Sequence, residues 1–233
     1  MTDAPPSAPI QEETLRRIEG AGNYNAWLLE RALPEVGRRV LDVGAGVGTF
    51  TARVAEGREV VALEPDAEFA AALVDRFAGS PNVRVLHERI EDLRKERAFD
   101  SIVCFNVLEH IADDRATLET FHRLLVPGGT LFLLVPAHPS LYGSLDRELY
   151  HHRRYRRADV ERLLTASSFQ PRVVRYVNPI GGIGWLVAGR VLRRSLIPGA
   201  PLALFDRLVP LLRRLDSVEF PFGLSVWAIA QRA

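Results

Sequence analysis

The sequence predicts an α/β protein with a mainly parallel sheet, because apolar strand-like runs alternate with helical segments and a glycine-rich turn follows the first run. The chain has 233 residues, of which 47% are hydrophobic and 25% are charged. These proportions are typical of a globular domain with a sizeable core. We therefore expect a flexible tail over residues 1–12 and a single domain over residues 13–233.

The alternation of strands and helices can be followed along the whole chain. Helical spacing is found in residues 15–33, 49–56, 67–77, 114–125 and 158–167. The strand-like runs are residues 39–43, 59–63, 83–86, 100–105, 130–135, 172–177 and 225–230. In parallel sheets ligands bind beyond the carboxyl ends of the strands. The segments that follow these ends (residues 44–48, 64, 90–91, 106–110 and 136–142) should therefore meet at one edge of the sheet.

The turn after the first strand carries glycines at positions 44, 46 and 48. Glycines allow a sharp turn and a close approach of the backbone to a ligand. Dinucleotide-binding enzymes also use such a turn, but their G-x-G-x-x-G spacing is missing here. Asp42 places a carboxylate just before the first glycine, where it suits a cationic amino group better than a pyrophosphate.

Residues 40–48 (VLDVGAGVG) resemble the first motif of the class I S-adenosylmethionine-dependent methyltransferases. The resemblance continues in order and spacing through residues 64–66 (EPD), 90–93 (IEDL), 99–100 (FD), 106–110 (NVLEH) and 125–129 (LVPGG). It implies an α/β, Rossmann-like, seven-stranded and mostly parallel sheet with an antiparallel last strand. It also implies S-adenosyl-L-methionine as the cofactor.

The resemblance assigns roles to individual residues of this chain. Glu64 would accept hydrogen bonds from both ribose hydroxyls, and Asp42 would lie near the amino group of the methionine portion. Tyr24 and Trp27 would either cover the cofactor as a lid or anchor their helix in the core. The full set of expected cofactor-binding residues is Tyr24, Asp42, Gly44, Ala45, Gly46, Glu64, Pro65, Asp66, Ile90, Glu91, Asn106 and Val107.

The sequence leaves the catalytic residues open. Methyl transfer needs a general base only when the nucleophile must lose a proton, and a histidine suits that task. The candidates are His110, His138 and Tyr142, with His151, His152 and Asp146 as further polar groups near the strand ends. The alternative reading makes His110 a structural residue and makes His151 and His152, which precede two arginines, part of a surface cluster.

We expect no bound metal. Some ubiquinone-type and small-RNA methyltransferases carry a Glu-x-x-Glu-His motif that binds a divalent ion. This chain has Asn106 in place of the first glutamate, which removes charge from such a site. The single cysteine, Cys104, lies in an apolar run and excludes a disulfide framework or a thiolate cluster.

Residues 178–223 form a long connection between the last two strands, and we expect them to fold as a helical cap over the ligand edge. Between residues 147 and 214 there are fourteen arginines and four acidic residues. These arginines either lie on ordinary solvated helix faces or form a surface for an acidic ligand or an anionic membrane. The apolar runs of residues 178–214 would accordingly pack on the domain, contact a membrane surface or form a dimer interface.

Together these features predict methylation of a small, hydrophobic metabolite at oxygen, nitrogen or carbon. The alternatives are a non-catalytic, membrane-associated protein of the same fold and a nicotinamide-dependent oxidoreductase, which would need a Tyr-x-x-x-Lys pair that Lys95, the only lysine, cannot complete. The formal net charge of +1 gives no reason to expect a nucleic-acid partner. Because no signal peptide and no apolar run of eighteen residues is found, we expect a cytoplasmic protein.

Overall fold

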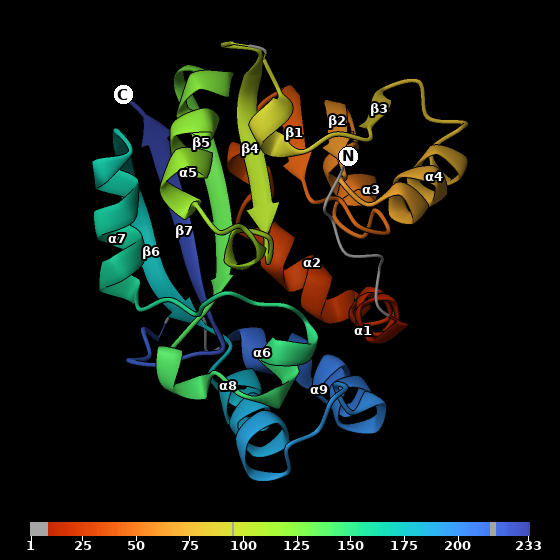
Figure 1. Cartoon of the computed structure of the whole chain (residues 1–233), viewed down its shortest axis with the longest axis vertical. Helices are drawn as coiled ribbons and strands as arrows, with labels where there is room; N and C mark the ends of the chain where they lie inside the picture. The colour runs from red at the N-terminus through yellow and green to blue at the C-terminus, as the bar shows by residue number, and fades with distance from the viewer. Residues whose placement is uncertain (1–8, 95, 215–217) are drawn as a thin grey trace.

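A computed structural model describes residues 9–94, 96–214 and 218–233. The protein has a seven-stranded sheet with helices on both faces (Figure 1). The strand order is β3-β2-β1-β4-β5-β7-β6, and β7 pairs antiparallel with both β5 and β6. The predicted fold class is confirmed. The strands are β1 (Arg39–Val43), β2 (Glu59–Leu63), β3 (Val83–Leu86), β4 (Phe99–Phe105), β5 (Leu125–Pro136), β6 (Phe169–Val177) and β7 (Ser225–Arg232).

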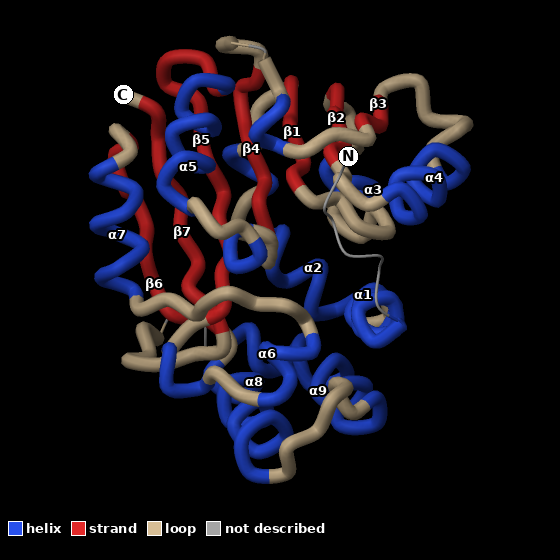
Figure 2. The backbone as a smooth tube through the Cα atoms, viewed as in Figure 1, coloured by secondary structure: helices blue, strands red, loops and turns tan. Residues whose placement is uncertain are grey.

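Both faces of the sheet are buried, so its central strands are almost entirely apolar. Along β4, Ile102 and Cys104 belong to the core on one face, while Val103 and Phe105 belong to the core on the other. The first face is covered by α5 (Asp114–Leu124) and α7 (Arg157–Ala166), and the second by α2 (Gly22–Glu30) and α3 (Thr51–Val54). Figure 2 shows these helices as separate layers in front of and behind the strands.

The N-terminal region differs from the expected tail and single helix. Residues 1–8 of the expected tail lie outside the described residues, but residues 9–12 already form the start of α1 (Pro9–Glu19). Gly20 and Ala21 separate α1 from α2, so that the predicted helix over residues 15–33 is two helices. The side chain of Asn25 donates a hydrogen bond to the carbonyl oxygen of Ile18, which fixes the corner between them.

The helix expected over residues 49–56 is shorter than predicted. It spans only Thr51–Val54 and lies between two glycines with positive φ, Gly48 at +83° and Gly57 at +70°. The next helix, α4 (Ala67–Arg76), begins one residue after Asp66, as predicted. Its N-terminal amides of Glu68 and Phe69 donate hydrogen bonds to the Asp66 carboxylate.

The long connection before β7 is helical, as the sequence predicts. It contains α8 (Pro179–Trp185), the π-helical segment η5 (Leu186–Val191) and α9 (Gly199–Leu212). These helices lie beneath the carboxyl ends of the central strands, beside α1, α2 and α6 (Ser144–Glu148) (Figure 1). Val209 of α9 is buried in the core on the α2 side of the sheet, and the ring of Phe205 packs edge-on against Tyr24.

None of the helices in the described part of the chain combines the length and the hydropathy that a membrane crossing requires.

We expect Phe121→Ala to destabilise the fold strongly. Phe121 of α5 is fully buried among strands and helices of the first core, and such truncations cost about 3–5 kcal/mol because they leave a cavity. Chemical denaturation should show this loss of unfolding free energy. Val74→Ala on α4 is the control, because Val74 is 55% exposed, and it should change the unfolding free energy by less than about 1 kcal/mol. Equal effects of the two variants would contradict the assigned core.

Candidate functional site

A cavity of about 470 Å³ lies at the carboxyl edge of the sheet, where the segments after β1, β2 and β4 meet the 3₁₀ turn η2 (Ile90–Asp92). Eight of the twelve residues expected to bind the cofactor line it. They are Gly44, Gly46, Glu64, Pro65, Ile90, Glu91, Asn106 and Val107. The predicted convergence of these segments therefore holds in the structure.

At Gly44 the glycine turn packs too closely on the segment after β4 to carry a side chain. Gly44 has a φ of +66°, and a Cβ atom there would come within 2.4 Å of Cγ2 of Val107. Gly46 also has a positive φ, and its amide nitrogen donates a hydrogen bond of 2.7 Å to Oε2 of Glu64. The backbone of the turn is thus exposed to the cavity and tied to the end of β2.

Glu64 is the polar centre of this cavity. It is buried, and its other oxygen, Oε1, accepts a hydrogen bond of 3.0 Å from the amide of Asp66. Burial raises the pKa of Glu64, while the hydrogen bonds from Asp66 and Gly46 act in the opposite direction. A carboxylate has about four lone-pair positions, so two backbone contacts hold it in place and leave acceptors for a ligand that bears two hydroxyls.

Four of the expected cofactor residues lie elsewhere. Asp42 is buried below the glycine turn, where Oγ1 of Thr51 donates a hydrogen bond of 2.6 Å to it, and burial raises its pKa to about 7 despite that bond. Asp66 caps α4, and Ala45 is nearly buried with Ala62 and Leu73. Tyr24 faces a second cavity. The cavity that the other eight residues share does not include these four.

The second cavity, of about 530 Å³, lies between the cap helices, α1, α2 and the end of β4. Its wall is largely apolar, with contributions from Tyr24, Trp185 and Phe205. Trp27, the other lid candidate, is instead an anchor in the core beneath Tyr24. Asn106 lines both cavities, so they meet at the carboxyl end of β4.

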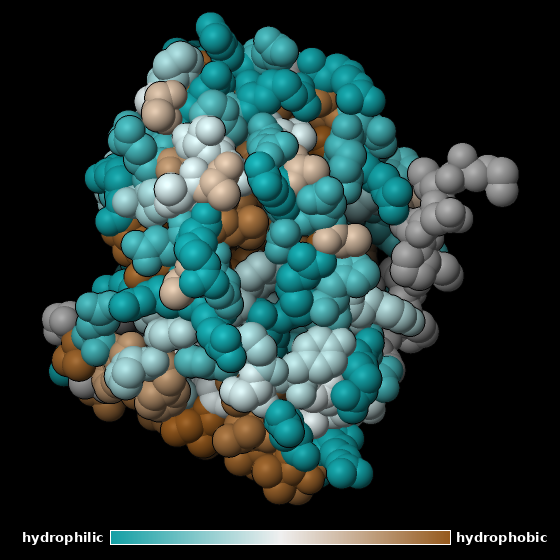
Figure 3. Space-filling view, turned by 60° about the vertical axis from the view of Figure 1, so that its left-hand side comes forward, coloured by the Kyte–Doolittle hydropathy of each residue, from teal (hydrophilic) through white to brown (hydrophobic). Residues whose placement is uncertain are grey.

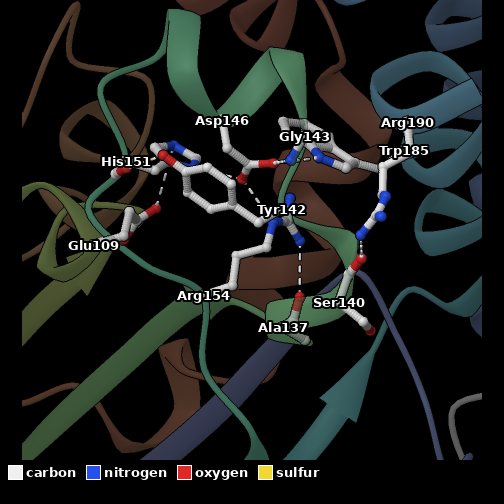
Figure 4. Close-up of polar contacts among 10 residues, drawn as sticks. All are labelled: Glu109, Ala137, Ser140, Tyr142, Gly143, Asp146, His151, Arg154, Trp185 and Arg190. Carbon is white, nitrogen blue, oxygen red and sulfur yellow. Dashed lines mark hydrogen bonds and ion pairs between the residues drawn. The ribbon is translucent and has the colours of Figure 1, made fainter. Parts of the chain in front are cut away.

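A network of buried charges forms the polar side of the second cavity (Figure 4). Asp146 accepts hydrogen bonds from Nδ1 of His151 at 2.9 Å and from Nε of Arg154 at 2.6 Å. It also accepts bonds from the amide of Gly143 and from Nε1 of Trp185. Burial alone would raise the pKa of Asp146, but the His151 hydrogen bond and the charge of Arg154 hold it below its usual value.

The contacts of Asp146 determine the state of His151. An ionised carboxylate only accepts hydrogen bonds, so Nδ1 of His151 carries the proton and Nε2 is left as an acceptor in the neutral ring. Nε2 lies 4.0 Å from Oε1 of Glu109. Both carboxyl oxygens of Glu109 are buried and lack a hydrogen-bond partner within the described residues. Burial raises the pKa of Glu109 to about 8.

The three leading base candidates lie in different places. His110 lines the first cavity, and burial, together with His151 and His152, lowers its pKa to about 3, which makes it a weak base. His138 stacks on Tyr176 and belongs to neither cavity wall. The hydroxyl of Tyr142 donates a hydrogen bond of 2.8 Å to the carbonyl oxygen of His151 and so supports that segment.

The basic residues that follow Asp146 differ in their burial. His151 and Arg154 are 8% and 4% exposed, so they are buried and are not part of a surface cluster. His152 is exposed at the first cavity, and Arg153 pairs with Asp114. The sequence signal for the burial of His151 and Arg154 was Asp146, the acidic residue that precedes them. The partners of this carboxylate cannot be identified from the linear sequence.

The same region contains the side chains best placed to hold a cation. Glu109, His110 and His151 each offer one ligand atom, and these atoms lie within 4.8 Å of one another. Asp146 would orient His151 through the hydrogen bond to its Nδ1 atom. Asn106, on the walls of both cavities, adds no charge to this group. The absence of a bound metal stays a prediction of the sequence.

Comparisons with known proteins agree with this geometry. A family model described as a methyltransferase domain matches residues 17–176. The chain therefore belongs to the methyltransferase domain family, as the motif resemblance implies. A ubiquinone biosynthesis O-methyltransferase of Xanthomonas campestris is 39% identical over 106 residues, which are 44% of this chain and 44% of that protein. The match thus spans less than half of the relative's length.

Solved structures share the fold at low sequence identity. A 1,6-didemethyltoxoflavin-N1-methyltransferase of Burkholderia thailandensis, with bound S-adenosylhomocysteine, is 20% identical with a TM-score of 0.58, covering 100% of this chain and 93% of that one. The [4+2]-cyclase SpnF is also 20% identical, with a TM-score of 0.62 over 91% of this chain and 81% of that one. These likenesses establish the fold, and proteins of different activities share it.

The raised pKa of Glu109 predicts a pH-dependent stability. Its proton is held more tightly in the folded protein than in the unfolded chain, so its stabilising effect is complete at acidic pH and is lost as the pH rises from about 5 to about 8. Relative to Glu109→Gln, the wild type should lose about 1 kcal/mol of unfolding free energy per pH unit in this window.

Denaturant titrations at several pH values, in the presence of EDTA, would measure this loss. Glu56→Gln is the matched control, because Glu56 is exposed on the surface, and it should follow the wild-type pH dependence. Parallel curves for the wild type and Glu109→Gln would contradict the assignment of a buried, protonated carboxyl.

Proposed function

We propose that this protein transfers the methyl group of S-adenosylmethionine to a small, largely apolar acceptor. The observation that carries the proposal is the position of Asn106 on the walls of both cavities. A donor in the first cavity and an acceptor in the second would meet at this residue. The methyltransferase family, and the S-adenosylhomocysteine bound by the Burkholderia structure, support S-adenosylmethionine as the cofactor.

The residues of the first cavity suit the chemical groups of this cofactor. The glycine backbone allows close approach, Glu64 would bind the ribose hydroxyls, and Ile90 and Glu91 would border the adenine. Asn106 would lie on the side of the sulfonium. When bound, S-adenosylmethionine supplies a methyl group on a positively charged sulfur. Asp42 would act through the glycine turn rather than by direct contact, because its carboxylate is bonded to Thr51.

The second cavity suits an apolar acceptor with a polar reacting end. The apolar wall would hold the body of the acceptor and exclude water, which strengthens polar interactions in the site. The polar end would face Glu109, His151 and Arg154. Arg154 has a buried Nη2 group without a hydrogen-bond partner among the described residues, and it would bind an anionic or carbonyl oxygen.

His151 is the residue we assign as the general base for an acceptor that must lose a proton. Its Nδ1 is bonded to Asp146, its Nε2 lies 4.0 Å from Oε1 of Glu109, and both residues line the second cavity. The Asp146 carboxylate would stabilise the ring when Nε2 takes up a proton. Asp146 does not touch the acceptor and is a positioning residue, held by Arg154 and Trp185.

Calorimetric titration with S-adenosylhomocysteine tests the cofactor site. The wild type should bind saturably, and Glu64→Gln should bind about 10- to 100-fold more weakly, because hydrogen bonds to a charged group contribute about 1.5–3 kcal/mol. Gly46→Arg should abolish binding, since its side chain would occupy the cavity. Glu56→Gln, an exposed control, should bind as the wild type does. A folded wild type that does not bind would refute the proposal.

Methylation assays with labelled S-adenosylmethionine and a panel of phenolic and lipid-like acceptors test the assignment of the base. With an acceptor hydroxyl, His151→Gln should lower kcat about 10²- to 10⁴-fold, as expected for loss of general-base catalysis, and leave S-adenosylhomocysteine affinity unchanged. His138→Gln is the control and should retain kcat, because His138 lies outside both cavities. Equal kcat values in the two variants would contradict the assignment.

A further inference from the structure

The cap of the second cavity exposes an unusual amount of apolar side chain. Among the described residues, fourteen large hydrophobic side chains are exposed, and eleven of them lie between residues 180 and 222. We call the exposed side of α8, η5, α9 and the connection between η5 and α9 (residues 192–198) the cap face. Figure 3 shows hydrophobic residues gathered at this lower end of the molecule, whereas the rest of the visible surface is mainly hydrophilic.

The apolar character of α9 exceeds what its packing requires. Leu204, Leu208 and Leu211 are spaced by four and three residues, so they form one stripe, and they are 60%, 45% and 59% exposed. The opposite side of the helix already supplies Val209 and Phe205 to the core and to Tyr24. The outer stripe therefore leaves about half of each leucine side chain exposed to solvent.

The charges on the cap face all have one sign. Arg190, Arg193, Arg194 and Arg207 are exposed, and the only acidic residue between positions 179 and 214 is Asp206. The Asp206 carboxylate faces α2, because it accepts hydrogen bonds from the amide of Tyr24 and the side chain of Asn23. Apolar side chains flanked by arginines are typical of segments that lie in the interface of an anionic membrane.

The cap face is continuous with the wall of the second cavity. Ile180, Val187 and Leu192 line that cavity and are also 44%, 43% and 55% exposed. An apolar path therefore leads from the surface between α8 and α9 into the cavity where Glu109 and His151 lie.

We propose that the cap face docks on an anionic lipid bilayer, and that an acceptor with a hydrocarbon chain enters the second cavity from this bilayer. This inference rests on the proposed function for the acceptor, but docking itself requires no turnover. Anionic headgroups would neutralise the arginines. A second copy of the chain on the same face would bring arginines against arginines, which disfavours a dimer.

Vesicle flotation with the full chain tests the docking. We expect binding to vesicles that contain phosphatidylglycerol and little binding to phosphatidylcholine vesicles. An arginine near an anionic surface contributes about fivefold to partitioning, so Arg193→Glu with Arg194→Glu should weaken binding at least about twentyfold. Val191→Asp with Leu208→Asp should weaken it about as much, because both side chains are exposed on the cap face.

Matched controls carry the same changes elsewhere on the surface. Arg84→Glu with Arg94→Glu, and Val74→Asp, are exposed substitutions outside the cap and should bind vesicles as the wild type does. Absence of wild-type binding would overturn the inference, as would equal loss in the controls. A stable dimer in sedimentation that Val191→Asp with Leu208→Asp dissociates would also overturn it, in favour of a second copy.

Titration of the same samples with S-adenosylhomocysteine separates this inference from the proposed function. Variants that bind S-adenosylhomocysteine but not vesicles are expected. A wild type that binds S-adenosylhomocysteine and no vesicle overturns only the membrane inference. A wild type that binds anionic vesicles and no S-adenosylhomocysteine overturns only the proposed function.

Discussion

The arrangement of the second cavity depends on one buried carboxylate, that of Asp146. It accepts hydrogen bonds from Gly143, His151, Arg154 and Trp185, which belong to the segment after β5 and to the cap. Four donors compensate the cost of burying the charge, whereas removal of one partner from such a buried pair costs about 3–5 kcal/mol. The same bonds fix the tautomer of His151 and draw α8 against the domain. The Asp146 carboxylate thus positions both the polar residues of the cavity and the apolar wall that α8 contributes.

The parallel sheet provides the second constraint, because it brings the carboxyl ends of its strands to one edge. The first cavity lies at this edge, where the glycine turn is bonded to Glu64. The second lies between the cap helices, α1, α2 and the segment after β4. Asn106, directly after β4, has a φ of +55° and is placed between them. The cavity at the sheet edge thereby adjoins the cavity that the cap encloses.

The sheet and the first cavity could be predicted because their signals are local. Apolar runs define the strands, and Glu64 directly after β2 and Ile90 shortly after β3 are brought together by the order of the strands. The second cavity could not be predicted, since its polar groups pair over distances that the sequence does not display. His151 and Arg154 look like surface residues until Asp146 is found beside them. The partner of Asp42 was not predictable for a similar reason, because the neighbouring helix supplies Thr51.

A crystal structure of the complex with S-adenosylhomocysteine would test the central claim most directly, namely that the two cavities are the donor and acceptor halves of one methyl-transfer site. We expect the ribose to lie on Glu64 and the sulfur to lie beside Asn106, facing the cavity of Glu109 and His151. A ligand bound in the second cavity, or a sulfur separated from it by the protein, would contradict the account.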